Sequence, residues 1–175
     1  METRQPPEEF EMRKHLIAAS AILAATVTLV AAACGGNPTT QTATGSAACI
    51  NASASHKAHV VVEHLKGSSV DRCVGFSGDS VAGLELLKQS GIEYSSQKTS
   101  FGTAICQVDN EPASFSSCFP SGAPFWALWV STDGTTWKIS DVGIDGVTVT
   151  NGEALGWRYT APDASPAPPP APKKG

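Results

Sequence analysis

The run FWALWVSTDGTTWKIS, residues 125–140, constrains the fold of this chain most strongly. Apolar and polar side chains alternate on both sides of Asp133-Gly134, a pair typical of a two-residue hairpin turn. With that turn, Trp129 lies opposite Lys138, and the two side chains share one face of the hairpin. The sequence therefore predicts two antiparallel strands rich in tryptophan.

The two faces of this hairpin predict different surroundings. One face is uniformly apolar and is expected in the core; it carries Trp126, Leu128, Val130, Trp137 and Ile139. The mixed face carries Phe125, Ala127, Trp129, Lys138 and Ser140. Trp129 is then either a half-buried ring packed by the stem of Lys138, or a surface that stacks a planar ligand together with Phe125. A register slip of one residue would exchange the faces.

Only the middle of the chain has the composition of a folded domain. Residues 34–56 are mostly small and polar, which predicts a disordered tether. Residues 161–175 read APDASPAPPPAPKKG, and we expect a disordered, polyproline-like tail that serves as a spacer or binds a partner. The folded domain is therefore expected at residues 57–160.

Within residues 57–160, the element pattern is β-β-α-β-β-β. The single helix is expected to begin at Val81, after a cap at Asp79 or Ser80, and to end at Gly91. One helix lying on a mixed sheet is an α+β fold. The sequence thus predicts a small α+β domain.

The N-terminus resembles a signal peptide, residues 1–33. Met12 is followed by Arg13 and Lys14, then by an apolar run, so translation is interpreted as starting at Met12. Three alanines precede Cys34 and resemble a bacterial lipobox, which implies acylation of Cys34, as with palmitate, and anchoring on the outer side of the cell membrane. The alternatives are a secreted protein cut before Cys34 or a retained membrane helix.

The other four cysteines predict two disulfides, as is usual for an exported domain. Cys106 and Cys118 are the favoured pair because a strand end and a loop separate them, which leaves Cys49 with Cys73. Metal binding is the rival interpretation, but the chain has no Cys-x-x-Cys spacing. We expect no metal site.

Charge and motif spacing disfavour two classes of function. A net charge of −4 without a basic cluster gives no footprint for nucleic acid. Ser77 lies in Gly-Phe-Ser-Gly, whose second glycine comes too early for a nucleophile elbow. Asp109 and Glu111 fall in turns, where acids are usually solvated. We therefore expect no catalytic residues and no enzyme.

Residues 60–159 resemble the transcobalamin-like C-terminal domain, a β-grasp-type module. The matching stretches are SVAGLELLKQSGI, FGTAICQVDNEP, PFWALWVSTDGTTWKISDVGIDGVTV and NGEALGWRY. The resemblance implies a β-grasp-like fold and gives cobalamin, or a related corrinoid, as a lead for a ligand. It implies no cofactor firmly, since the family's binding surfaces lie in variable loops.

Two functions from different classes follow. The first is a lipid-anchored binder that captures a corrinoid or another planar cofactor for a membrane importer. It would stack the ligand on Phe125 and Trp129, with polar contacts from Lys138 and from the loop at 109–124. The alternative is a structural or protein-interaction module of the cell envelope, which docks a partner through the same face or a free sheet edge.

Overall fold

The computed structural model describes residues 48–173. The expected signal peptide, the lipidation residue Cys34 and tether residues 34–47 lie outside the described residues. The elements are β1 (His56–Glu63), β2 (Ser69–Phe76), β3 (Ser80–Ala82), α1 (Gly83–Gln89), β4 (Tyr94–Thr99), β5 (Gly102–Val108), β6 (Phe125–Ser131), β7 (Lys138–Ile139), the 3-10 turn η1 (Ile144–Gly146), β8 (Thr148–Thr150) and β9 (Ala154–Thr160).

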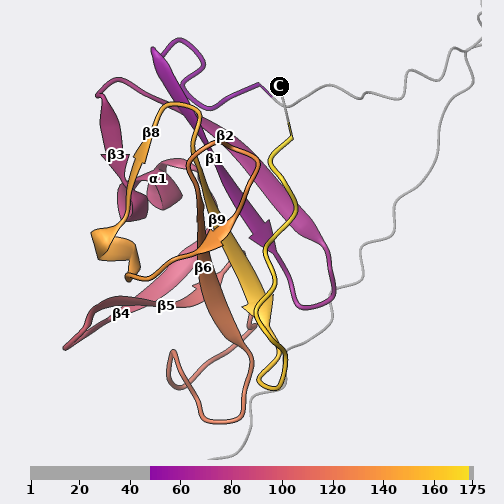
Figure 1. The fold of residues 1–175 in the computed structure, drawn as a ribbon. Helices are drawn as coiled ribbons and strands as arrows, with labels where there is room; N and C mark the ends of the chain where they lie inside the picture. Colours follow the sequence, from indigo (N-terminus) through magenta and orange to yellow (C-terminus); the bar gives the residue numbers. More distant parts are fainter. Residues whose placement is uncertain (1–47, 174–175) are drawn as a thin grey trace, which may run out of the picture. The chain divides into compact units, whose positions relative to one another are not determined.

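The largest sheet has five strands in the order β2-β1-β9-β6-β7 (Figure 1). Its central pair, β1 and β9, is parallel, whereas all other neighbours in this sheet are antiparallel. Two short ribbons, β3–β8 and β4–β5, complete the strands. The predicted α+β class, with one helix on a mixed sheet, is confirmed.

The core lies between one face of this sheet, here called the inner face, and α1. Val60 and Val62 of β1 and Leu155 and Trp157 of β9 point into it, because alternate residues of a strand share a face. On the helix, Leu86 and Leu87 are fully buried in the same cluster. The β-branched residues of β1 thus both favour the strand and fill the core.

The helix is shorter than the sequence predicts. Val81 belongs to β3, where it pairs with Val149 of β8, so α1 begins only at Gly83. Its N-cap is Ala82 and no side chain caps it, which makes the expected cap at Asp79 or Ser80 wrong. A strand partner from far along the chain has outweighed local capping. The predicted end is confirmed, since Gly91 follows the helix with φ of 69°.

The hairpin register differs by one residue from the prediction. Trp129 pairs with Ile139 and Val130 with Lys138, with a loop of six residues between the strands. In this loop, the Asp133 carboxylate accepts the backbone N–H groups of Thr135 and Thr136 at 2.8 and 2.6 Å. These bonds satisfy the backbone locally, so the chain does not form the two-residue turn.

The slip moves Trp137 and the two residues of β7, Lys138 and Ile139, to the faces opposite those predicted. Lys138 moves to the face of Val130, and Trp137 moves to the face opposite the core. The expectation that Trp137 and Ile139 lie in the core is therefore wrong, and Ile139 shares the face of Trp129 and is 40 % exposed. Trp126 is confirmed in the core, at 6 % exposure. The indole of Trp137 instead packs beside Gly156, on the face of the sheet that points away from α1.

Both predicted disulfides are confirmed, Cys49–Cys73 and Cys106–Cys118. They indicate an extracytoplasmic location, because such bonds persist in oxidising compartments. Within residues 48–173, no helix has the length and apolar character needed to cross a membrane.

The two segments that flank the strands follow defined paths. Cys49 is bonded to Cys73, and the N–H of Ile50 donates to the Cys73 carbonyl at 2.9 Å. At the other end, residues 161–173 return along the large sheet (Figure 1). Within this segment, Pro169 is buried. These contacts correct the expectation of disorder for residues 48–56 and 161–173, because a disulfide and a sheet face hold segments whose composition could not form a core alone.

Candidate functional site

A pocket of about 570 Å³ lies between the loop at 109–124 and the start of β6. We call it the loop pocket. Its lining is largely aromatic and prolyl, with three serine hydroxyls, and comprises Cys106, Pro112, Ser114, Phe115, Ser116, Ser117, Cys118, Pro120, Ala123, Pro124, Phe125, Trp126 and Tyr159. Its volume is that of a small-molecule site, which is roughly 300–1,000 Å³.

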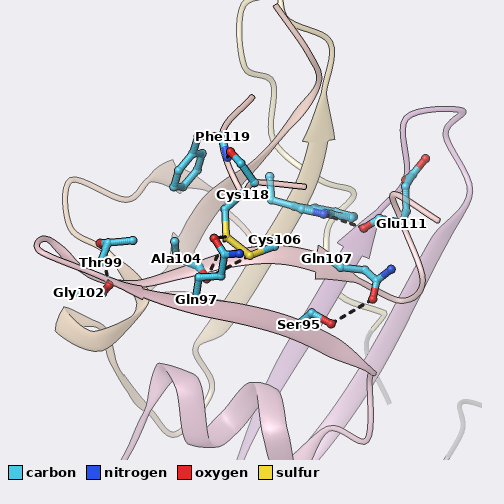
Figure 2. The surroundings of a disulfide bond; sticks show 12 residues. Ser95, Gln97, Thr99, Gly102, Ala104, Cys106, Gln107, Glu111, Cys118 and Phe119 are labelled. Atoms are coloured by element: carbon cyan, nitrogen blue, oxygen red, sulfur yellow. Dashed lines mark hydrogen bonds between the residues drawn. A yellow bond between two sulfur atoms is a disulfide. The ribbon is translucent and has the colours of Figure 1, made fainter. Parts of the chain in front are cut away.

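The Cys106–Cys118 disulfide fixes one side of the loop pocket. Cys106 lies in β5, and the bond ties the loop to the β4–β5 ribbon (Figure 2). Cys118 Sγ lies 3.3 Å from the Gln97 side-chain oxygen of β4. Ala104, Cys106 and Cys118 form a small buried cluster, against which Phe115 packs. The loop therefore has an apolar anchor of its own, separate from the main core.

Trp126 and Tyr159 form the wall on the sheet side. They are direct partners across β6 and β9, and their ring centroids lie 4.8 Å apart. Trp126 Nε1 donates to the backbone carbonyl of Glu111 at 2.9 Å, which fixes the indole against the loop. Because both rings are nearly buried and one is hydrogen-bonded, this wall is preformed.

A cluster of charged side chains holds the first residues of the loop. His64 Nδ1 lies 2.8 Å from Glu111 Oε2, and its Nε2 lies 3.0 Å from Asp109 Oδ2. The same Glu111 oxygen accepts the N–H of Leu65 at 3.1 Å. The His64 ring meets Trp126 edge to face, at 6.2 Å between centroids. The end of β1 is thereby fastened to the loop that borders the pocket.

This charged cluster is a feature that the sequence analysis missed. The sequence predicts Asp109 and Glu111 to be solvated acids of a turn, yet both form hydrogen bonds with the His64 ring, which is more than forty residues away in the chain. The sequence around them indicates only a turn, and the structure has this turn at residues 109–110, where the φ angles are 47° and 62°. No spacing in the sequence links them to His64, since the contact depends on how β1 lies beside β9 and β6.

The loop pocket has a polar group that no described residue uses. Tyr159 is 8 % exposed, and no hydrogen bond joins its hydroxyl to any residue within 48–173. Burial, and secondly the charge of Glu111, raise the pKa of Tyr159 above its ordinary value of 10.0. The phenol therefore stays protonated and can donate a hydrogen bond to a ligand.

The three predicted ligand residues do not form one site. Phe125 and Trp129 share a face of β6, as expected, but only Phe125 borders the loop pocket. Trp129 is 7 % exposed, so it offers no open stacking surface. Lys138 lies on the other face, and its Nζ is 2.7 Å from Asp141 Oδ2. The register slip separates Lys138 from Trp129.

No family model and no curated protein matches this chain. Among solved structures, it is similar to a protein from Ruminococcus gnavus that has been described, provisionally, as metal binding. That likeness has a TM-score of 0.47 and 19% identity, over 61% of this chain and 97% of the other. Within residues 48–173, no three His, Cys, Asp or Glu side chains are grouped so as to hold a metal ion.

Proposed function

We propose that this protein is a non-enzymatic module that binds a small ligand in the loop pocket, outside the cytoplasm, and that Cys34 anchors it to the membrane by lipid. The preformed aromatic wall of the pocket carries this proposal. Trp126 is held by Glu111, and the loop is held by its own disulfide, so the pocket exists before a ligand arrives. A preformed site binds without a large ordering cost.

The lining defines the class of ligand. Phe115, Phe125, Trp126 and Tyr159 favour a flat, partly apolar molecule, and the hydroxyl of Tyr159 can donate a hydrogen bond to an acceptor on it. A corrinoid meets this description, although a pocket of about 570 Å³ would hold one edge of the macrocycle rather than enclose it. Delivery to a membrane importer is the role that suits such a binder.

The arrangement of β1 and β9 supports a relation to β-grasp-type domains. These two strands are parallel neighbours at the centre of the sheet, and one helix covers the inner face. On this proposal, a relation to β-grasp-type domains explains both the transcobalamin-like resemblance of the sequence and the choice of a corrinoid as the first ligand to test. The ligand would then contact the loop pocket instead of Trp129 and Lys138.

The test is isothermal titration calorimetry of cobalamin, cobinamide and haem with the oxidised chain 34–175 carrying Cys34→Ser. Phe125→Ala removes a wall of the pocket and should weaken binding by ten-fold or more. Phe101→Ala is the matched control, since Phe101 is 97 % exposed on the β4–β5 turn and should leave affinity unchanged.

Two results would contradict the proposal. The absence of heat with all three compounds would remove the tetrapyrrole class of ligand. Binding that survives Phe125→Ala unchanged would place the ligand elsewhere than the loop pocket.

A further inference from the structure

The middle of the second face of the large sheet, here called the outer face, is buried although no helix or strand within residues 48–173 covers it. One row crosses it from strand to strand, and consists of Asp71, Val61, Gly156, Trp129 and Ile139. Val61 is 1 % exposed and Trp129 is 7 % exposed. The proline-rich tail, residues 161–173, supplies the cover (Figure 1).

Three contacts seat the tail on this face. Arg158 Nη1 of β9 donates to the Pro168 carbonyl at 2.8 Å. The next residue, Pro169, lies buried over Gly156. Farther along, the N–H of Lys173 donates to Asp71 Oδ2 at 2.6 Å, while the other oxygen of Asp71 lies 2.8 Å from His59 Nδ1. The tail thus runs from β9 across to β2 through backbone contacts and one proline ring.

The slot for the proline depends on a glycine and an indole. A Cβ atom built on Gly156 would lie 2.7 Å from Pro169 Cγ and 2.9 Å from Trp137 Cζ3, distances that real Cβ atoms do not adopt. Glycine therefore creates the depth of the slot, and Trp137 forms its wall. An aromatic wall against a proline ring, with a side-chain donor to the adjacent carbonyl, is the chemistry by which polyproline segments are recognised.

The resident tail leaves two donors of this face unused. The indole N–H groups of Trp129 and Trp137 are buried, and no residue within 48–173 accepts a hydrogen bond from either. A buried donor without an acceptor is unfavourable. A proline-rich segment whose carbonyl groups are placed differently could accept from these indoles, and would then fit the face better than the tail does.

We propose that the outer face is a polyproline-binding groove, which the chain's own tail occupies and which receives a proline-rich segment of another extracytoplasmic protein. The tail competes as a tethered ligand with an effective concentration of about a millimolar. A second segment therefore binds weakly until the tail leaves. The groove and the loop pocket share no lining residue, so the proposal stands apart from ligand binding there.

The test uses the oxidised chain 34–175 with Cys34→Ser and a fluorescent peptide of sequence SPAPPPAPK, residues 165–173. Pro169→Asp should release the tail, because a carboxylate would be buried against Trp137. We expect fluorescence anisotropy to show peptide binding at least ten-fold tighter than in the parent chain. Pro166→Asp is the matched control, since Pro166 is exposed, and it should behave as the parent does.

Two further measurements keep the proposal falsifiable. Adding Gly156→Ala to Pro169→Asp fills the slot and should abolish binding, as should replacing the three consecutive prolines of the peptide with glycine. Absence of peptide binding to Pro169→Asp, in a protein whose near-ultraviolet circular dichroism is native, would overturn the proposal. A parent chain that light scattering shows to be a dimer, and that Pro169→Asp makes monomeric, would also overturn it by assigning the groove to a second copy.

Discussion

Removing the Cys106–Cys118 disulfide should destabilise the domain strongly. The bond joins residues separated by 12 positions. In the chain-entropy model, a loop of this size lowers the stability of the unfolded state by about 3 kcal/mol. Domains are typically stable by about 5–15 kcal/mol, so the loss is a large fraction of the whole. For a domain of this length it corresponds to a fall in Tm of about 10 °C.

The assay is urea unfolding of the oxidised protein, followed by tryptophan fluorescence, with both cysteines replaced by alanine. The matched control removes Cys49–Cys73, whose separation is 24 positions. Loop entropy grows only slowly with length, so the control should lose about as much stability. The two variants should differ in their affinity for a ligand of the loop pocket. Only the loss of Cys106–Cys118 should weaken that binding, because only this bond borders the loop pocket. A loss below about 1 kcal/mol with an unchanged m-value would refute the entropic reasoning.

Two further variants test the core and the response to acid. Leu86→Ala should lower the free energy of unfolding by about 2–5 kcal/mol because Leu86 is 0 % exposed. Leu84→Ala, at a partly buried position of the same helix, should lower it less in the same urea titration. Equal losses for the two variants would contradict this placement of the core. The side chain and the N–H of Thr103 hold the pKa of Asp145 below its ordinary value of 3.8, so this carboxylate stabilises the fold above that pH and the contribution disappears as the pH falls. Asp145→Asn should therefore lose less stability than the parent when urea midpoints at about pH 3 and pH 7 are compared, and an identical acid loss would show that Asp145 contributes nothing.

Loop pocket residues were partly accessible to sequence reasoning. The tryptophan-rich hairpin predicts Phe125 as a ligand residue, and the sequence also predicts contacts from the loop at 109–124. Tyr159 and the His64 cluster were missed because their partners come from distant strands. Residue spacing along one segment carries no information on which strand will become its neighbour.

By itself, the sequence determined several local elements and favoured the pairing of Cys106 with Cys118, which left Cys49 with Cys73. The run of β-branched residues Val60-Val61-Val62 favours the strand β1, Gly91 ends the helix, and the apolar face with Trp126 identifies part of the core. Each of these depends on periodicity or backbone preference within a few residues, which a single segment contains. Cys106 and Cys118 are also close enough in the chain for their pairing to follow from the elements between them.

Only the tertiary structure decided the register of the hairpin and the place of the tail. A turn at Asp133 shifted the register by one residue and so exchanged the faces of Lys138 and Trp137. The tail has too little apolar surface to fold alone, yet Gly156, brought beside Trp137 by strand pairing, gives Pro169 a slot. Such contacts depend on several segments that meet only when the sheet is complete, and no single stretch of sequence contains them.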